Sequence, residues 1–212
     1  MPSAEDVDAV TVDAFGTLVE LAEPSERLGA ALRERGVERS RETVAAAFAA
    51  EVSYYVPRAH EGRDADSLTK LRRDCAAVFL AEAGADLDPE EFAPAFVAAL
   101  EFRALDGAQA ALERLHAAGV DLACVGNWDV SLPDHLAAAG LAHRFTTIVT
   151  SAEAGAPKPD PAPFALALAR IGVEPQRALH VGDSDADRDG AEAAGLAFEP
   201  APLATLPARL GL

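Results

Sequence analysis

The chain is poor in the residues that mark disulfide-rich and membrane proteins. Among its 212 residues there are two cysteines, Cys75 and Cys124, far apart and in apolar surroundings. We expect buried thiols there rather than a disulfide or a metal site. No apolar run is long enough to cross a bilayer, and no leader with a charged start and an apolar centre opens the chain. A soluble, cytoplasmic protein with no membrane partner is therefore predicted.

Positive charge is also scarce. The chain has 18 basic and 35 acidic residues, which gives a net charge of −17. Nucleic acid is excluded as a partner, because its binding needs a cationic surface. Only two of the basic residues are lysines, Lys70 and Lys158. Half of the residues are hydrophobic, which is enough to bury a core, and the composition is compatible with a monomer or a homodimer.

Strands and helices are expected to alternate except in one long segment. Ala9–Val12 is apolar or β-branched and predicts a short buried strand. Residues 20–103 show helical periodicity with no convincing strand. From Asp106 onward helices alternate with strands, which are expected at Val120–Val125, Thr146–Thr150, Ala178–Val181 and Leu196–Phe198. The pattern predicts an α/β fold: a Rossmann-like parallel sheet core of residues 1–19 and 104–212 with helices on both faces, and an inserted α-helical domain of residues 20–103.

Four helices are predicted within the inserted segment from their caps and apolar faces. Their expected ranges are Pro24–Arg35, a helix capped by Ser40 that stops at Pro57, Ser67–Glu82, and a fourth that begins at the Asp88-Pro89 cap. Residues 58–66 are polar and are expected to form a loop between the second and third helices.

Each chemical motif follows a predicted strand, where open α/β sheets collect their sites. Asp13 follows the first strand, and the turn pair Gly16-Thr17 comes shortly after it. A carboxylate beside backbone N–H groups that can cradle an anion is a candidate nucleophile with its receptor. Taken alone, the same aspartate could instead open a helix or a turn.

Two later stretches supply a cation and further carboxylates. Lys158 lies between two prolines that restrict its backbone, so its ammonium can neutralise Asp13 and an anionic substrate; the alternative is a surface lysine in a turn. Asp183 and Asp187 follow another strand, where they can serve a metal or merely cap a helix. An EF-hand starting at Asp185 is excluded, because its twelfth position is Leu196 and a strand precedes it.

Four motifs, in order, resemble those of the haloacid dehalogenase superfamily. They are Asp13-Ala14-Phe15-Gly16-Thr17-Leu18, Val125-Gly126-Asn127, Pro157-Lys158-Pro159-Asp160 and Gly182-Asp183-Ser184-Asp185-Ala186-Asp187. The resemblance covers nearly the whole chain. It implies a hydrolase of the helical-cap type (subfamily IA-like), in which residues 20–103 form a lid over the strand ends. It also implies Mg²⁺ as the cofactor.

The resemblance gives the acidic residues specific roles. Asp13 is implied to be the nucleophile that forms an aspartyl-phosphate. A carboxylate and a phosphate ~4 Å apart repel by about 4 kcal/mol at an effective dielectric near 20, and a divalent cation between them reverses that sign. The implied ligands are Asp13, Asp183 and the backbone carbonyl of Phe15. Asp187 is implied to support the metal's water shell or to hold Asp183 and Lys158.

Two positions depart from the family's pattern. Gly126 stands where the family usually has serine or threonine, so backbone N–H groups and Thr17 are expected to share that contact, with Asn127 donating to a substrate oxygen. Phe15 stands where the family's phosphatases have an aspartate that protonates the leaving group, a step worth about 10²–10⁴-fold. The family's 2-haloacid dehalogenases also have an aromatic there, but they use no metal. Trp128 is expected to pack against the lid.

Several polar residues of the lid are candidates for reading an anionic substrate. Tyr54, Arg58 and His60 cluster around the expected end of the second helix, next to Tyr55 and Arg63. A solvated loop with two packed tyrosines explains the same residues equally well.

Three functions follow from these observations. The favoured one is Mg²⁺-dependent phosphoryl hydrolysis of a small phosphorylated metabolite, an anionic substrate, through Asp13. The second is metal-independent hydrolysis of a carbon–halogen bond by the same Asp13. The third is a binding or regulatory protein that lost turnover together with its acid.

Overall fold

The computed structural model describes residues 6–212, and these divide into two compact units. One unit consists of the chain up to Glu20 together with Phe102–Leu212, and the other is Leu21–Glu101. All residues of the four motifs lie in the first unit. Within the described residues, every helix is too short or too polar to span a membrane.

The first unit is built on a five-stranded parallel sheet with β1 at its centre. The strand order is β5-β4-β1-β6-β7, and every neighbouring pair is parallel. The strands are β1 (Ala9–Val12), β4 (Asp121–Gly126), β5 (Thr147–Thr150), β6 (Ala178–Gly182) and β7 (Ala197–Pro200). The chain adds β4 and β5 on one side of β1 and then crosses to β6 and β7 on the other. The order therefore reverses beside β1, which is where such sheets form their sites.

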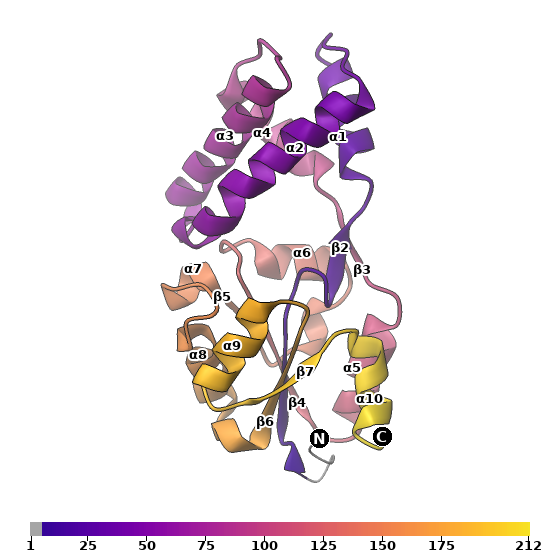
Figure 1. Cartoon of the computed structure of the whole chain (residues 1–212), viewed down its shortest axis with the longest axis vertical. Coiled ribbons are helices and arrows are strands. Elements are labelled where there is room, and N and C mark those ends of the chain that lie inside the picture. The colour runs from indigo at the N-terminus through magenta and orange to yellow at the C-terminus, as the bar shows by residue number, and fades with distance from the viewer. Residues whose placement is uncertain (1–5) are drawn as a thin grey trace. The chain divides into compact units, whose positions relative to one another are not determined.

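Helices cover both faces of this sheet (Figure 1), which confirms the predicted architecture. They are α5 (Ala108–Ala117), α6 (Leu132–Ala138), α7 (Ser151–Ala154), α8 (Ala162–Ile171), α9 (Asp185–Ala193) and α10 (Leu206–Arg209), with short 3₁₀ turns at Ala142–Arg144, Pro175–Arg177 and Leu203–Thr205. Successive strand residues point to opposite faces. Val10 and Val12 accordingly pack with residues of α5, α6 and α10, whereas Ala9 packs with residues of α8 and α9.

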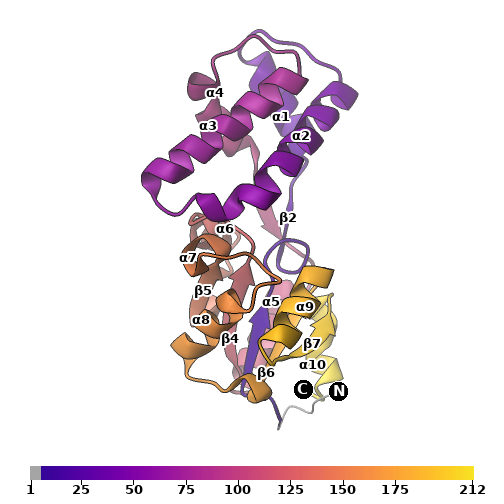
Figure 2. The same ribbon diagram turned by 60° about the vertical axis from the view of Figure 1, so that its left-hand side comes forward.

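The second unit is a bundle of four helices (Figure 2). The helices are α1 (Pro24–Arg33), α2 (Arg41–Tyr55), α3 (Ala65–Glu82) and α4 (Pro89–Ala99). Ser40 and Asp88 cap α2 and α4, since their side chains accept from the backbone N–H groups of the first turns. Three phenylalanine rings, Phe79, Phe92 and Phe96, form the centre of the core, with centroids 5.3–6.4 Å apart. Cys75 and Cys124 are both buried thiols, as expected.

Two local predictions were wrong. Residues 20–103 were expected to contain no strand, but Val19–Leu21 (β2) pairs with Phe102–Ala104 (β3). Each strand has three residues and is incompletely buried, so neither carries a visible alternation. The expected loop at 58–66 begins inside a 3₁₀ helix, Val56–Glu61, because Ala59 is buried there against the bundle.

Candidate active site

The central strands bring the motif residues together at their carboxyl ends. Asp13 follows β1, Asn127 follows β4 and Asp183 follows β6, and these three strands are neighbours in the sheet. The backbone N–H of Asp13 donates to the carbonyl of Val181 at 2.9 Å, which continues the β1–β6 pairing to the residue that carries the carboxylate. The side chain of Asp13 is therefore held by regular backbone rather than by a loose loop.

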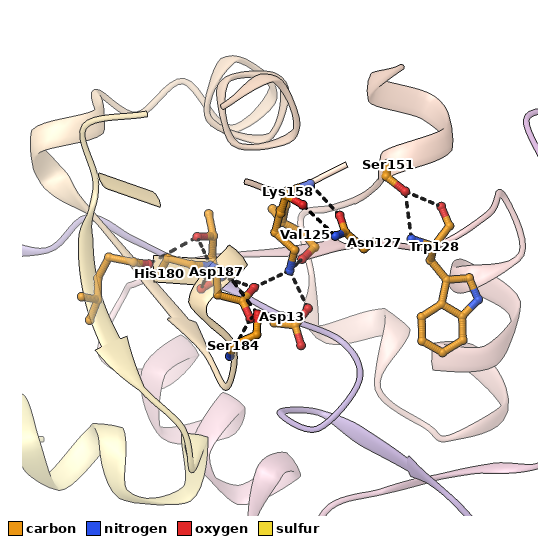
Figure 3. A network of polar contacts seen from close by, with 11 residues as sticks. Asp13, Val125, Asn127, Trp128, Ser151, Lys158, His180, Ser184 and Asp187 are labelled. Carbon is orange, nitrogen blue, oxygen red and sulfur yellow. Dashed lines mark hydrogen bonds and ion pairs between the residues drawn. The ribbon is translucent and has the colours of Figure 1, made fainter. Parts of the chain in front are cut away.

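Lys158 is the cation of this cluster (Figure 3). Its Nζ donates to Asp13 Oδ1 at 2.5 Å, to Asp187 Oδ1 at 2.5 Å and to the carbonyl of Val125 at 2.8 Å. All three N–H groups of the ammonium thus have an acceptor, although Lys158 is only 5 % exposed. Burial opposes the charge, but the two carboxylates outweigh it and raise the pKa of Lys158 above its usual value. Lys158 remains protonated.

Asn127 holds the backbone of Lys158. The amide Nδ2 of Asn127 donates to the carbonyl of Lys158 at 3.0 Å, and Oδ1 accepts from the N–H of Lys158 at 2.7 Å. This pair of hydrogen bonds fixes the segment from which the ammonium extends. The amide was expected to donate to a substrate oxygen; in the structure both of its polar atoms form hydrogen bonds with Lys158.

Asp187 is the second anchor of the ammonium, and it is ionised. Its Oδ1 accepts from Lys158 and lies 3.1 Å from Nε2 of His180, while its Oδ2 accepts from the N–H and hydroxyl of Ser184. Ser184 and Asp187 form a capping box at the start of α9. Burial alone would raise the pKa of Asp187, but the hydrogen bond with His180 and the charge of Lys158 hold it well below its usual range. Asp187 therefore both caps α9 and forms an ion pair with Lys158.

Asp13 and Asp183 are short of compensating positive charge. Burial, aided by the negative charges of Asp187 and Asp183, raises the pKa of Asp13 to about 6 against the pull of Lys158. Burial and the charge of Asp187 also raise the pKa of Asp183. Counting three carboxylates and one ammonium, the cluster has a formal charge of −2 when all are ionised. The site favours a further cation.

The three carboxylates fit a divalent metal ion. Asp13, Asp183 and Asp187 each offer one oxygen, and these oxygens lie within 4.8 Å of one another. Hard carboxylate oxygens are the donors that Mg²⁺ prefers. A charge of +2 would balance the formal charge of the cluster.

Two glycines allow the loops to approach these carboxylates. Gly16 has φ of +83°, and a Cβ there would lie 2.1 Å from Asp183 Oδ2, so the Phe15-Gly16 backbone lies against that carboxylate. A Cβ on Gly182 would lie 2.3 Å from Cγ of Asp187. The side chain of Phe15 is 50 % exposed. The arrangement leaves the backbone of Phe15 near the carboxylates and its side chain half-exposed.

Thr17 and Gly126 have more limited parts in the site as it stands. The hydroxyl of Thr17 is buried and has no hydrogen-bond partner among residues 6–212. The hydroxyl is covered from solvent in this structure, and its share in contacting a substrate stays a prediction. A Cβ on Gly126 would lie 2.9 Å from Leu132 and 3.3 Å from Ala14. Gly126 therefore packs closely against α6, and a side chain at this position would require Leu132 to shift.

Trp128, which was expected to pack against the lid, belongs to the core of the first unit. Trp128 is 7 % exposed and packs within the first unit, with its ring centroid 4.9 Å from that of Phe102 and 5.7 Å from that of His135. The hydroxyl of Ser151 accepts from the N–H of Trp128 and donates to its carbonyl, which fixes the turn after β4. The position of Trp128 next to the site in sequence did not reveal that its ring turns into the core.

The lid candidates belong to the helical unit. Arg58 stacks on Tyr54, with its guanidinium carbon 4.2 Å from the ring centroid, and donates to the carbonyl of Tyr54 at 2.9 Å. His60 is half-buried in the 3₁₀ helix that follows α2. A role in reading a substrate stays a prediction for all three.

Sequence reasoning missed His180 and its partner Thr11. Both are fully buried, one on β6 and one on β1, and their side chains are 2.8 Å apart. The available signal was a polar residue inside each of two apolar strands, just before the motif carboxylates. A buried polar side chain needs a hydrogen-bond partner, so each of these residues indicated a side-chain contact, although the sequence did not show with which residue.

Comparison with known proteins gives the chain its family. The family model of haloacid dehalogenase-like hydrolases matches residues 7–195. Haloacid dehalogenase-like hydrolase domain-containing protein 3 of Mus musculus is 41% identical over 108 residues, 50% of this chain and 41% of that protein. The phosphoserine phosphatase of Thermus thermophilus is 41% identical over 91 residues, 42% of this chain and 36% of that protein. The matched segments span less than half of either relative.

The fold is shared with solved structures over almost the whole chain. The crystal structure of a 2-haloacid dehalogenase from Pseudomonas syringae has a TM-score of 0.66 and 25% sequence identity, with 97% of this chain and 98% of that chain covered. The family match covers all four motifs. The chain therefore belongs to the haloacid dehalogenase-like hydrolases.

Proposed function

We propose that this hydrolase is a Mg²⁺-dependent phosphatase that acts on a small phosphorylated metabolite through an aspartyl-phosphate on Asp13. The observation that carries the proposal is the Lys158 ammonium held 2.5 Å from Asp13 beside a cluster of three carboxylates. Such a cluster suits a metal ion and an anionic substrate together. The similarity to a protein named phosphoserine phosphatase supports the same reaction class.

In the proposed reaction, Asp13 acts as the nucleophile. A carboxylate oxygen of Asp13 attacks phosphorus, the bond from phosphorus to the leaving oxygen breaks, and that oxygen departs with the electron pair. Water then attacks phosphorus of the aspartyl-phosphate, which releases inorganic phosphate and restores the carboxylate. Lys158 offsets negative charge at Asp13 and on the phosphoryl group throughout. Asn127 keeps the ammonium in place through the backbone of Lys158.

Mg²⁺ would be held by Asp13, Asp183 and the backbone carbonyl of Phe15, with Asp187 in support. Bound there, it would supply the positive charge that lets two anions meet. Phe15 offers no proton to the leaving oxygen, so the leaving group departs as an anion or takes its proton from water. We therefore expect acyl, anhydride and aryl phosphates to be better substrates than alkyl phosphates.

The helical unit is proposed to be the specificity cap. Tyr54, Arg58 and His60 supply the aromatic and cationic groups that an anionic metabolite would need. We retain the predictions of a cytoplasmic protein, monomeric or homodimeric, on the sequence evidence alone.

A second candidate is hydrolysis of a carbon–halogen bond by the same Asp13. It is favoured by Phe15, whose half-exposed ring occupies the position of the acid that protonates an alkoxide leaving group. A halide leaves without a proton and does not need that acid. It also agrees with the similarity to a structure named 2-haloacid dehalogenase. The three-carboxylate cluster argues for the phosphatase, since halide displacement needs no metal.

One experiment separates the candidates. Release of inorganic phosphate from aryl, acyl and alkyl phosphates is measured beside halide release from 2-haloacids, each with Mg²⁺ or with EDTA. The phosphatase predicts phosphate release that requires Mg²⁺ and is lost in Asp13→Asn. Halide release that persists in EDTA would support the second candidate instead. Absence of both activities would favour a binding protein.

A further inference from the structure

Two fully buried polar side chains meet in the centre of the sheet. Thr11 on β1 and His180 on β6 are register partners, and each is 0 % exposed. Thr11 Oγ1 lies 2.8 Å from His180 Nδ1, and the other ring nitrogen, Nε2, lies 3.1 Å from Asp187 Oδ1. The ring of Phe164 packs edge-on against the imidazole. An unbroken chain of polar contacts thus runs from Thr11 through His180 and Asp187 to Lys158 and Asp13.

The contacts decide where the imidazole carries its proton. Asp187 Oδ1 also accepts from Lys158, and an ionised carboxylate has no proton to give, so Nε2 of His180 must be the donor. In the neutral ring the lone pair is then on Nδ1, where it accepts the hydroxyl proton of Thr11. The opposite tautomer would point a lone pair at the carboxylate of Asp187.

A competing acceptor makes the hydroxyl of Thr11 necessary. The backbone carbonyl of Thr11 lies 3.1 Å from Nδ1 and would accept a proton from that nitrogen. Without the hydroxyl, this carbonyl competes with the carboxylate of Asp187 for the single proton of the neutral ring, so part of the population has no donor to Asp187. The hydroxyl removes that competition, because it can give its own proton to Nδ1 at 2.8 Å; its other acceptor, the carbonyl of Leu179, lies farther away at 3.5 Å.

We propose that Thr11 fixes the Nε2–H tautomer of His180, and that His180 is a positioning residue that orients Asp187 toward Lys158. A neutral donor suits this task, because it directs the carboxylate without adding a second cation beside Lys158. Residues that hydrogen-bond to a metal ligand or to an ion-paired side chain, and so orient it, typically contribute about 10- to 100-fold to affinity or rate. The proposal holds for phosphoryl and for halide chemistry, since both use Asp13 and Lys158.

The first test needs neither metal nor substrate. In protein labelled with ¹⁵N at histidine and kept in EDTA at pH 7.5, the long-range ¹⁵N–¹H spectrum of His180 distinguishes the two neutral tautomers. We expect hydrogen on Nε2 in the wild type and in Thr11→Ser, which keeps the hydroxyl. In Thr11→Val, which has nearly the same shape, we expect a mixture of the two tautomers; hydrogen on Nε2 alone would refute the role of Thr11. A wild-type ring with hydrogen on Nδ1 would overturn the proposal, even if Thr11→Val failed to fold.

The second test measures the consequence for the site. Thr11→Val and His180→Leu should lower kcat by about 10- to 100-fold with a much smaller change in KM, and Thr11→Ser should recover most of the loss. Equal kcat in Thr11→Val and wild type, with the tautomer changed, would refute the positioning role. Absence of all activity in the wild type would contradict the proposed function but would leave the spectroscopic result to decide the tautomer.

Discussion

Replacing Asp13 by asparagine should remove the activity and yet stabilise the metal-free protein. Asparagine has nearly the shape of aspartate and keeps an oxygen for Lys158, but an amide is a very poor nucleophile. Its neutral side chain also avoids the electrostatic cost of an ionised Asp13, which lies buried near two other carboxylates. The variant thus separates the effect of the Asp13 carboxylate on catalysis from its effect on the free energy of unfolding.

The expected gain follows from the pKa of Asp13. Burial raises that pKa from 3.8 to about 6 in the folded chain, so ionisation is less favourable there than in the unfolded chain. The wild type therefore loses stability as the pH rises from about 4 to about 6, and the loss is constant above that range. A shift of this size corresponds to about 3 kcal/mol. Asp13→Asn should be more stable by about that amount at pH 7.5 and no more stable at pH 4.

Urea unfolding in EDTA between pH 4 and pH 8 measures this difference. Asp189→Asn is the matched control, because Asp189 is an exposed carboxylate that, among residues 6–212, pairs only with Arg188; its effect should stay within about 0.5 kcal/mol. Mg²⁺ at a hundred times its Kd should stabilise the wild type by about 2.7 kcal/mol and close most of the gap. An Asp13→Asn variant that is no more stable than wild type at pH 7.5, or whose advantage does not change with pH, would refute the reasoning.

Three further outcomes are expected. Glu51 is buried in the helical unit, and burial raises its pKa from 4.5 to about 7. At pH 8, Glu51→Gln should raise the opening free energy of α2 and α3 by up to about 3 kcal/mol, which is measured as slower hydrogen exchange. At pH 4 the exchange should be unchanged. Phe15→Asp should raise kcat/KM for alkyl phosphates by up to about 10²-fold and change it little for aryl phosphates; an equal effect on both would contradict the missing-acid argument. In calorimetric titrations Asp183→Asn should weaken Mg²⁺ binding by at least about tenfold, whereas an equal loss in Asp189→Asn would argue against the metal assignment.

The roles of single residues in the network show where sequence reasoning reached its limit. Asp13 and Asp183 were identified as carboxylates at strand ends, and the structure brings their oxygens within 4.8 Å of each other. Asn127 was identified as well, but its pairing with the backbone of Lys158 was not foreseen. That pairing joins two loops 31 residues apart, and no periodicity along the chain records it.

Features that depend on near neighbours in the chain were predictable from the sequence. Helix starts at Ser40 and Asp88 follow from side chains that satisfy the next N–H groups, and the parallel sheet follows from alternating apolar strands and amphipathic helices. Which side chains face one another across strands depends instead on how the strands pair in the fold. Thr11 and His180 are 169 residues apart and meet because β1 and β6 pair in one register. Register and strand order are set by packing of the whole core, so contacts of this kind leave no local pattern in the sequence.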